Sequence, residues 1–532
     1  MKVPQNPKIK DLKDCEIIGK PTKRHPKEAW AKVTGKAEYG IDIRVDNLKY
    51  AAVLHPRVFG AKVKSFDANK ALKRKGVLKV KEIPTGIAVI AQKWWIAREA
   101  LSDINVQWEE GEFTKISSDD LHKEYETMME NKGAIARDEG DTKKAFKEAH
   151  KVLETQYNFP FLAHTPMEPL NLTVHHQKDR AILWSGSQMQ TLSRGTCAKI
   201  LGIHPENITY KTPYLGGGFG RRGGFNQDYV KEGTFVAKDE PYPVMTLWTR
   251  EDDVKIGNYR PMFKDKMKVA LDKDGDITAM EVKVVGQSIL LNRKENFEKY
   301  QIEGLSDHPY LIGNNNIQVY TPTSPIPTTF FRSVGHTHTA PIIEGIIDQA
   351  AYEAKKDAIT YRLEHLIDTR YVKLLKEVAR LSNWENRKKE KNVGYGVAIV
   401  GSFGSICAQI AKVKVSNNDF KVEQVWCSVD CGFAFNPRNV ENQMISGINF
   451  GIGVLKYGEI TIKNGETEQN NFYDYQVSRL SDTPKIEVSI INSFDSIGGI
   501  GEPGVPPILA AVPNAIFDAI GKRYTQFPIK IG

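Results

Sequence analysis

Cysteine is scarce in this chain of 532 residues, which contains only Cys15, Cys197, Cys407, Cys427 and Cys431. An odd and widely spaced set of this kind argues against a framework of disulfide bonds. No group of them has the spacing of an iron–sulfur cluster. Cys427 and Cys431 lie four positions apart in an expected strand, so their side chains would share one face. We interpret this pair as two buried thiols, because a metal site there would need further ligands.

Long apolar runs are also missing. No clean hydrophobic stretch reaches 18 residues, and the nearest candidates, 397–413 and 506–520, are broken by Gly, Ser, Gln, Pro or Asn. We therefore expect no membrane-spanning helix. The first 13 residues are polar and rich in lysine, which indicates no signal peptide. A cytoplasmic location and export to the periplasm on the signal of a partner both stay open.

Two catalytic signatures and one nucleic-acid pattern are absent as well. The sequence holds no Gly-x-Ser-x-Gly and no His-Glu-x-x-His, so nothing supports a serine hydrolase or a zinc peptidase. Lys plus Arg exceeds Asp plus Glu by 74 − 65 = 9, and these cations are spread along the chain. No basic stripe with interleaved aromatic residues is evident, so we expect no nucleic-acid partner.

The pattern of hydrophobic residues divides the chain into five parts. Residues 1–25 are typical of a tail, and 26–113 mix short β-type runs with helical stretches, which predicts a small α/β domain. Residues 114–150 are charged and have helical periodicity, which predicts a helical connector. Residues 151–385 and 386–532 are rich in expected strands, with helices and glycine-rich turns between them. We therefore expect an α+β protein with several domains.

The first segment with unusual chemistry runs from Leu215 to Arg222 and reads Leu-Gly-Gly-Gly-Phe-Gly-Arg-Arg. Four glycines around one Phe indicate backbone that approaches something closely or takes a positive φ. Successive N–H groups would form an anion-binding nest, and two arginines follow it. Arg221 stands where a Rossmann fingerprint needs its last glycine, and no Gly-Lys-Ser/Thr of a P-loop follows. A tight structural turn is the alternative interpretation.

The second segment, residues 498–507, encloses one carboxylate, Glu502, in a loop of glycine and proline. A Glu fixed in such a loop, instead of solvated on a helix, fits a position beside a reacting centre. Desolvation would raise its pKa towards that of a useful general base. The alternative is a Glu that caps the following helix, whose body would be residues 514–520.

Two further segments contain histidines. In 163–169, His164 and Glu168 stand at i and i+4, but two prolines argue against a helix that would let them share a metal. We favour a hydrogen-bonded His and Glu at the start of a strand. In 331–338, His336 and His338 would point the same way on a strand, but no third metal ligand lies nearby. Arg332 is the more informative residue there, as a partner for an anion or oxyanion.

Taken together, these segments resemble the molybdenum-binding large subunits of the xanthine dehydrogenase and aldehyde oxidoreductase superfamily, most of all the beta subunits of isoquinoline 1-oxidoreductases. The resemblance implies a small hammerhead-like α/β domain followed by two mixed α/β molybdopterin-binding domains, of which the second is incomplete. The matching pieces are 32–37, 58–67, 160–169, 216–222, 332–338, 429–432 with Asn436-Pro437, and 501–507.

The same resemblance implies roles for individual residues. Glu502 takes the place of the base that removes a proton from a water-derived oxygen, which then attacks an electron-poor carbon of an aldehyde or N-heterocycle. Phe219 and Val334 would line the substrate pocket. The residues implied to contact the cofactor are Gly217, Gly218, Phe219, Gly220, Arg332 and Gly501. The implied cofactor is molybdopterin, as molybdenum cytosine dinucleotide, and a separate small subunit with [2Fe–2S] clusters would take the electrons.

One departure from the family pattern affects the functional prediction. Full-length beta subunits carry a segment with Gly-Gln-Gly and Gly-Gly-Ser motifs that grips the pterin, and no equivalent is found in this sequence. Leu162 also stands where the xanthine dehydrogenase branch has a glutamine near molybdenum. We therefore expect a second chain to supply the missing segment. The alternatives are a non-catalytic assembly or scaffold protein of the same fold, a remnant or truncated piece, and a different cofactor, such as a nucleotide at the glycine loop.

Overall fold

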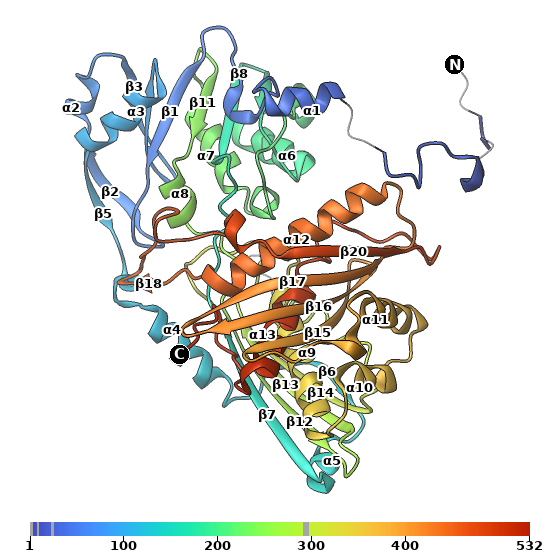
Figure 1. Cartoon of the computed structure of the whole chain (residues 1–532). Helices are drawn as coiled ribbons and strands as arrows, with labels where there is room; N and C mark the ends of the chain where they lie inside the picture. The colour runs from blue at the N-terminus through green and yellow to red at the C-terminus, as the bar shows by residue number, and fades with distance from the viewer. Residues whose placement is uncertain (1–3, 8–9, 23–25, 291–296) are drawn as a thin grey trace.

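The computed structural model describes residues 4–7, 10–22, 26–290 and 297–532. Figure 1 shows an upper part that contains the strands near the N-terminus and a lower part built on two further sheets. Helix α12 (Pro437–Tyr457) lies along the boundary between them. The chain is thus a mixed α/β protein with several sheets, as the sequence predicts.

The upper part is organised around a seven-stranded sheet with the order β10-β9-β8-β11-β1-β4-β3. Strand β4 is buried along its whole length, which explains its uninterrupted apolar sequence. Strand β1 pairs in parallel with β11, so the small domain near the N-terminus shares a sheet with residues beyond 151. The strands are β1 (Lys49–Leu54), β3 (Val77–Ile83), β4 (Gly86–Ala91), β8 (Asn171–Gln177), β9 (Arg180–Trp184), β10 (Ile208–Lys211) and β11 (Val244–Leu247).

A five-stranded sheet with the order β6-β14-β13-β12-β7 forms one layer of the lower part. Strand β6 was not expected, because residues 114–150 have helical periodicity. In the structure β6 pairs with β14 at the sheet edge, so a tertiary contact overrides the local pattern, while α4 and α5 around it are helical. The strands are β6 (Ala134–Glu139), β7 (Lys151–Phe159), β12 (Phe263–Leu271), β13 (Ile277–Gly286) and β14 (Asn314–Tyr320).

A four-stranded sheet with the order β15-β16-β17-β20 forms the other layer, and α13 (Pro506–Ile520) packs on it. Glycines permit this contact. A Cβ at Gly394 would lie 2.1 Å from the carbonyl oxygen of Ala515, and a Cβ at Gly396 would lie 2.1 Å from that of Ala511. The strands are β15 (Val393–Ser402), β16 (Ser405–Ser416), β17 (Asp419–Asp430) and β20 (Lys485–Ile491).

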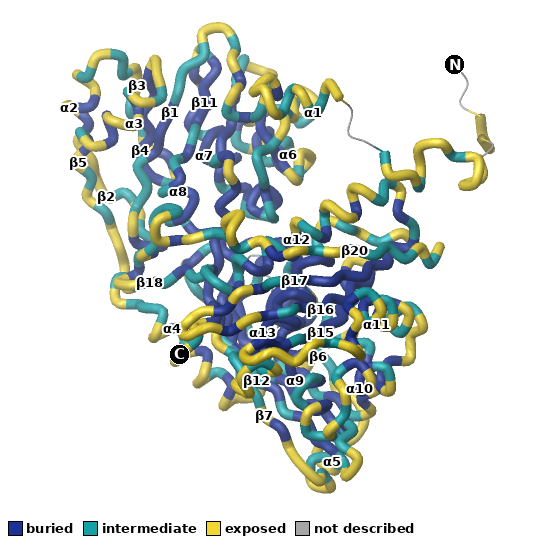
Figure 2. The backbone as a smooth tube through the Cα atoms, viewed as in Figure 1, coloured by how far each residue is buried: buried dark blue, intermediate teal, exposed yellow. Residues whose placement is uncertain are grey.

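One continuous hydrophobic core joins the two sheets of the lower part through α9 and α13. Figure 2 shows this as buried backbone around α13, β16 and β17, while the tail near the N-terminus is mostly exposed. Cys427 and Cys431 are buried free thiols, as expected. Within the described ranges, no group of three His, Cys, Asp or Glu side chains is arranged to hold a metal ion.

The remaining elements surround these sheets. No helix in the described part of the chain is both long enough and apolar enough to cross a membrane. The other strands are β2 (Lys62–Asp67), β5 (Asn105–Glu109), β18 (Ile462–Lys463) and β19 (Glu466–Thr467). The other helices are α1 (Pro26–Val33), α2 (Asn69–Leu72), α3 (Trp94–Ala100), α4 (Ser118–Met128), α5 (Thr142–Glu148), α6 (Gln190–Leu201), α7 (Asp228–Ala237), α8 (Arg250–Lys255), α9 (His336–Glu353), α10 (Ala358–His365) and α11 (Thr369–Leu381).

Candidate active site

Three segments that are far apart in the sequence line one open cavity of about 720 Å³. The first is the glycine loop, residues 215–220, which lies between β10 and α7. The second is the turn at 331–335, which leads into α9. The third is the glutamate loop, residues 498–504, which leads into α13. The fold therefore brings together the segments that the sequence marks as chemically unusual.

The glycine loop contains the close approaches that its composition predicts. Gly217 and Gly220 have φ values of +99° and +102°. A Cβ at Gly220 would lie 2.3 Å from the carbonyl oxygen of Phe330, so only glycine fits there. Phe219 also takes a positive φ, +55°, which is uncommon for a residue with a side chain.

Several backbone N–H groups of this loop are open. The N–H of Gly220 donates to Gln188 Oε1 at 3.2 Å. In the part of the chain that the structure describes, the N–H groups of Gly217, Gly218 and Phe219 have no protein acceptor. Gly218 and Phe219 line the cavity, and consecutive open N–H groups at such a wall suit an oxygen-rich or anionic ligand.

The two arginines that follow the loop do not extend this nest, which corrects the expectation from the sequence. Arg221 is buried and pairs with Asp228 at 2.6 Å. Arg222 is fully buried and pairs with Glu168 at 3.0 Å. Both guanidinium groups therefore face protein carboxylates behind the loop. The sequence shows that the arginines follow the glycines, but not which way they turn.

Glu502 lies in the wall of the cavity and does not cap α13, whose N-cap residue is Val505. Its Oε1 accepts a hydrogen bond of 2.8 Å from the N–H of Ser333, and the Ser333 hydroxyl donates to the Glu502 carbonyl at 2.8 Å. Burial raises the pKa of the Glu502 carboxyl group, while the Ser333 N–H and the charge of Arg332 act in the opposite direction. A fixed carboxylate with a raised pKa is suited to general base catalysis.

Arg332 holds the glutamate loop in place. Its Nε and Nη2 donate to the carbonyl oxygen of Gly501 at 2.8 and 2.6 Å. Its other donors reach Ser446 Oγ at 3.0 Å and Gln443 Oε1 at 3.1 Å on α12. The guanidinium group lines the cavity, but its hydrogen bonds go to protein oxygens. Its role in the structure is therefore to fix the loop that carries Glu502.

The turn that contacts Glu502 is strained. Ser333 has φ +80° and Val334 has φ +46°. A β-branched residue in the left-handed region is a clear outlier, and it persists only where the surrounding structure imposes it. Val334 lines the cavity directly. The observed strain is an argument for function at this turn, because such outliers cluster at active sites.

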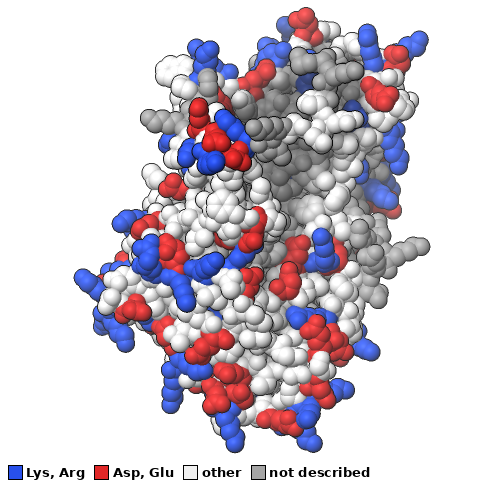
Figure 3. All heavy atoms as spheres, turned by 90° about the vertical axis from the view of Figure 1, so that its right-hand side faces the viewer, with Lys and Arg blue, Asp and Glu red and all other residues white. Residues whose placement is uncertain are grey.

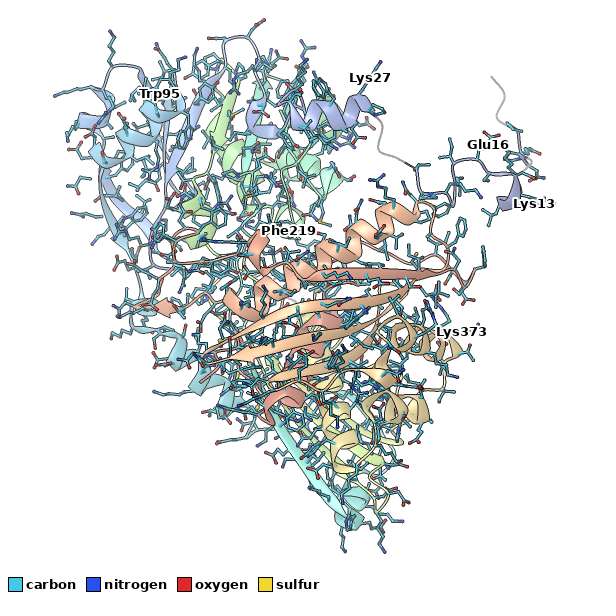
Figure 4. All side chains as sticks on the ribbon, viewed as in Figure 1. Lys13, Glu16, Lys27, Trp95, Phe219 and Lys373 are labelled. Atoms are coloured by element: carbon cyan, nitrogen blue, oxygen red, sulfur yellow. The ribbon has the colours of Figure 1, made fainter. Side chains whose placement is uncertain are left out.

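Phe219 lines both the large cavity and a second one of about 250 Å³. Its ring lies 5.1 Å from that of Phe450 on α12, and Phe450 lies 5.1 Å from Phe331. Figure 4 shows Phe219 where the upper part of the molecule meets α12. The second cavity is lined mainly by apolar groups and also contacts His164. The two cavities therefore adjoin, and Phe219, Phe331 and Ser446 line both of them.

The histidine segments turn out differently from the prediction. His164 and Glu168 are both buried and hydrogen-bonded, but to separate partners: His164 Nε2 lies 2.6 Å from the Phe330 carbonyl oxygen. His336 and His338 do not lie on a strand, because α9 begins at His336. His338 Nδ1 lies 2.8 Å from Asp265 Oδ2 in the core. These histidines support the structure and do not form a metal site within the described residues.

Sequence reasoning missed part of the cavity wall. Gln188 precedes α6, and Gln443 and Ser446 lie on α12. The helical spacing of Gln443, Ser446 and Phe450 places them on one face of α12, so a signal was present in the sequence. It could not be interpreted there, because nothing local shows which face of the helix turns toward the cavity.

Two family models match this chain, and both are described as a molybdopterin cofactor-binding domain. The first covers residues 122–366 and the second covers residues 340–484. Together they run over most of the chain and include the glycine loop and the turn at 331–335, whereas Glu502 lies beyond the second match.

Known proteins resemble nearly the whole chain. The beta subunit of isoquinoline 1-oxidoreductase from Brevundimonas diminuta is 27% identical over 552 residues, which covers 98% of this chain and 69% of the relative. The membrane-bound aldehyde dehydrogenase (pyrroloquinoline-quinone) from Gluconacetobacter polyoxogenes is 26% identical, and the match covers 94% of this chain and 70% of that relative. Among solved structures, quinoline 2-oxidoreductase from Pseudomonas putida 86 has a TM-score of 0.84 at 16% identity, with 97% of each chain covered.

Proposed function

We propose a specific reaction for this chain. The chain belongs to the molybdopterin cofactor-binding family and is a molybdenum-dependent oxidoreductase of the aldehyde oxidoreductase and xanthine dehydrogenase type. The proposed reaction is the oxidative hydroxylation of an aldehyde or an N-heterocycle with oxygen derived from water. Glu502 is its general base. The observation that supports this most strongly is the meeting of the Glu502 carboxylate, the open amides of the glycine loop and the strained turn in one cavity.

The residues present fit a molybdopterin. The open N–H groups of Gly217, Gly218 and Phe219 offer donors to its oxygen atoms, and the Gln188 and Gln443 amides stand in the same wall. A Cβ added at Gly501 would meet nothing within 4 Å, so the space in front of this residue is open. The cavity thus combines room for a large ligand with hydrogen-bond donors on its wall.

The chain's own contribution to the chemistry is proton transfer and positioning. When bound, the cofactor supplies the two-electron redox chemistry. Glu502 would take the proton from the water-derived nucleophile, for which burial and a fixed hydrogen bond from Ser333 prepare it. Arg332 would keep the carboxylate in place by holding the Gly501 carbonyl. The open amides of the glycine loop would orient the ligand opposite the base.

The substrate would bind against Phe219 and Val334, which line the large cavity. The second cavity offers apolar and aromatic walls from Phe219, Phe331 and Phe450. Planar electron-poor rings and apolar aldehydes suit such walls, because aromatic side chains pack well against flat apolar surfaces.

Electrons would leave through a separate [2Fe–2S] subunit. The cysteines lack cluster spacing, and Cys197, Cys407, Cys427 and Cys431 are buried in the structure. We propose the cytosine dinucleotide form of the cofactor on the resemblance to isoquinoline-type beta subunits alone. Both proposals are checked by extraction of the nucleotide and by iron analysis of the purified complex.

A second chain would complete the cofactor site. The chain matches 69% of the isoquinoline relative, and no Gly-Gln-Gly segment is found in the sequence. An apolar ridge of Phe433, Phe435, Phe494 and Ile497 lies on the loops before α12 and after β20, where the ring of Phe433 contacts those of Phe435 and Phe494. Phe494 and Ile497 are 65% and 61% exposed, which suits contact with another protein.

Charge does not single out a partner for this ridge. Figure 3 shows acidic and basic side chains interspersed over the face that is turned to the right in Figure 1. Burial of apolar surface is therefore the proposed basis of the contact. Phe494→Asp with Ile497→Asp should abolish co-purification of the second chain. Co-purification at the wild-type level would contradict this docking surface.

The function is tested with the wild-type chain expressed together with its genomic neighbours. Molybdenum per chain is measured first, and isoquinoline and an aromatic aldehyde are then offered in water enriched in ¹⁸O. Incorporation of one labelled oxygen into the isoquinoline product supports the proposal, whereas the aldehyde reports only substrate oxidation, because it exchanges its own oxygen with water through its hydrate. A purified complex without molybdenum, or one that contains molybdenum but leaves the label in water, contradicts it and favours a scaffold role.

A further inference from the structure

The carboxyl group of Glu168 is a buried junction behind the glycine loop. Its Oε2 accepts hydrogen bonds from the N–H of Gly216 at 2.7 Å and from Arg222 Nη2 at 3.0 Å. Its Oε1 accepts from the N–H of Ile41 at 2.9 Å and from Asn171 Nδ2 at 2.9 Å. Glu168 is only 7% exposed, so protein groups replace water around the charge.

Arg222 completes the junction from the other end of the loop. Its Nε donates to the Gly217 carbonyl at 2.8 Å, and its Nη2 donates to the Glu168 carbonyl at 2.9 Å. Its Nη1 donates to the Gly186 carbonyl at 3.2 Å. The planar fork of a guanidinium group reaches several oxygens at once, which an ammonium group cannot do in the same geometry.

The pair holds two adjacent residues, Gly216 and Gly217, at the start of the glycine loop. Glu168 holds the N–H of Gly216, and Arg222 holds the carbonyl of Gly217, so the peptide groups between them are fixed in orientation. The next N–H groups, of Gly218 and Phe219, are the ones that stay open toward the cavity. The ion pair thus lies on the side of the loop opposite the proposed ligand.

Close contacts at two glycines prevent the backbone around Glu168 from shifting. A Cβ at Gly216 would lie 2.4 Å from Cβ of Glu168. A Cβ at Gly40 would lie 2.4 Å from Asn171 Oδ1 and 3.1 Å from Glu168 Oε1. The segment around Gly40 and Ile41, near the N-terminus, is therefore packed directly against the carboxyl group that holds the loop.

We propose that Glu168 is a positioning residue for the cofactor: through Gly216 and Arg222 it holds the glycine loop in the conformation that presents open amides to the cavity, and through Ile41 it couples the segment at 39–42 to that loop. The consequence for the cofactor rests on the proposed function. The consequence for the loop rests on the contacts alone, and the two are measured separately.

The test uses the full-length chain with the partners that co-purify. Hydrogen exchange of the peptide spanning 214–223 is followed by mass spectrometry, and molybdenum per chain is measured on the same samples. In Glu168→Gln, which brings an amide donor to face other donors, we expect exchange of this peptide to accelerate by about tenfold or more. We also expect molybdenum per chain to fall, with the substrate KM of the loaded fraction unchanged.

Two milder variants keep the test decisive if Glu168→Gln does not fold. Gly40→Ala keeps both charges but displaces the carboxyl group, and Arg222→Lys keeps the charge but removes the fork. Each should accelerate exchange of the 214–223 peptide and lower molybdenum content. The matched control is Glu240→Gln. Glu240 is 4% exposed, and its carboxyl group lies 2.7 Å from Lys79 Nζ, in a pair that does not line the cavity. It should lower thermal stability and leave loop exchange unchanged.

The outcomes are separable. Unchanged loop exchange in all three variants, or acceleration equal to that in Glu240→Gln, overturns the positioning role. Accelerated exchange with undiminished molybdenum content overturns the link to the cofactor. If even the wild-type chain contains no molybdenum, the proposed function fails, whereas the loop exchange still decides whether Glu168 holds the loop.

Discussion

The backbone has opposite roles in two regions of the molecule: the contact between α13 and β15, and the wall of the large cavity. In the packed region, Gly394 and Gly396 let helix and strand touch, and the side chains between them are fully buried. In the cavity wall, the backbone is strained at Phe219, Ser333 and Val334, and peptide N–H groups stay open. The first region gains stability from contact, whereas the second gives up stability to hold groups ready for a ligand.

The identity of the strained residues supports this distinction. Elsewhere, asparagine is the most frequent non-glycine residue with positive φ among the described residues, and it adopts this conformation at small cost. At the cavities it falls on aromatic, hydroxyl-bearing and β-branched residues. The asparagines are Asn47, Asn258, Asn383, Asn392, Asn417 and Asn464; the residues that line the cavities are Thr165, Phe219, Val334 and Phe403, with Ser333 next to Val334.

The largest effect on stability is expected in the packed region. Gly396→Val places side-chain atoms where Ala511 and Ala515 backbone atoms lie within 2.2 Å of a Cβ. Helix and strand must separate, so the free energy of unfolding should fall by more than about 3 kcal/mol. Chemical denaturation measures this change. A variant as stable as the wild type would mean that the contact between α13 and β15 is not the one described.

The matching change in the cavity wall should affect function and not stability. A side chain at Gly501 enters open space, so Gly501→Leu should change the free energy of unfolding by less than about 0.5 kcal/mol. The same side chain occupies the proposed ligand space, so substrate oxidation should fall by about 100-fold or more. Thermal melts and turnover assays on one preparation distinguish the two effects. Full activity of Gly501→Leu would show that Gly501 does not line the ligand site.

The order of stability of glycine and alanine variants should be reversed between the strained turn and a buried strand. At Val334, with φ +46°, Val334→Gly should be more stable than Val334→Ala by about 1 kcal/mol, because glycine adopts this conformation without strain. At the buried strand residue Val282, Val282→Gly should instead be less stable than Val282→Ala by about 0.5–1 kcal/mol. Denaturant midpoints of the four variants provide the check. The same rank at both sites would contradict strain at the turn.

The smallest expected effect is a shift in a pH profile. Glu502 must be deprotonated to act as a base, and burial raises its pKa, so kcat/KM should fall as pH decreases through that raised pKa. Arg332 lowers the pKa of Glu502, so Arg332→Gln should move the acid limb to higher pH, and Arg332→Lys should leave it in place. Both variants should also oxidise substrate more slowly, because the Gly501 carbonyl loses hydrogen bonds from Arg332. An acid limb unmoved in Arg332→Gln would argue against Glu502 as the titrating group.

Much of the site could be predicted from local chemistry. Glycines around Phe219 indicated unusual backbone, and a single carboxylate between glycine and proline indicated a fixed Glu502. The mixed α/β class with several sheets was also predicted from the hydrophobic pattern. These signals are local, because they depend on the conformational limits of glycine and proline and on burial of one face.

The remaining features depend on contacts between distant residues. Arg222 looked like a ligand-binding group next to the glycines, and only the fold shows that it turns toward Glu168. His336 and His338 were expected on a strand, whereas the turn before them starts α9. Strand β6 forms because β14 pairs with it. No window of sequence contains the partner that decides each of these outcomes.

The most direct test compares Glu502→Gln with the wild type in samples matched for molybdenum content. Gln keeps the size of the side chain and can accept from Ser333, but it cannot take a proton. We expect equal molybdenum per chain, a melting temperature unchanged within about 2 °C and substrate oxidation slower by about 10²–10⁴-fold. Oxidation within a factor of about three of the wild-type rate, at equal molybdenum content, would contradict Glu502 as the general base.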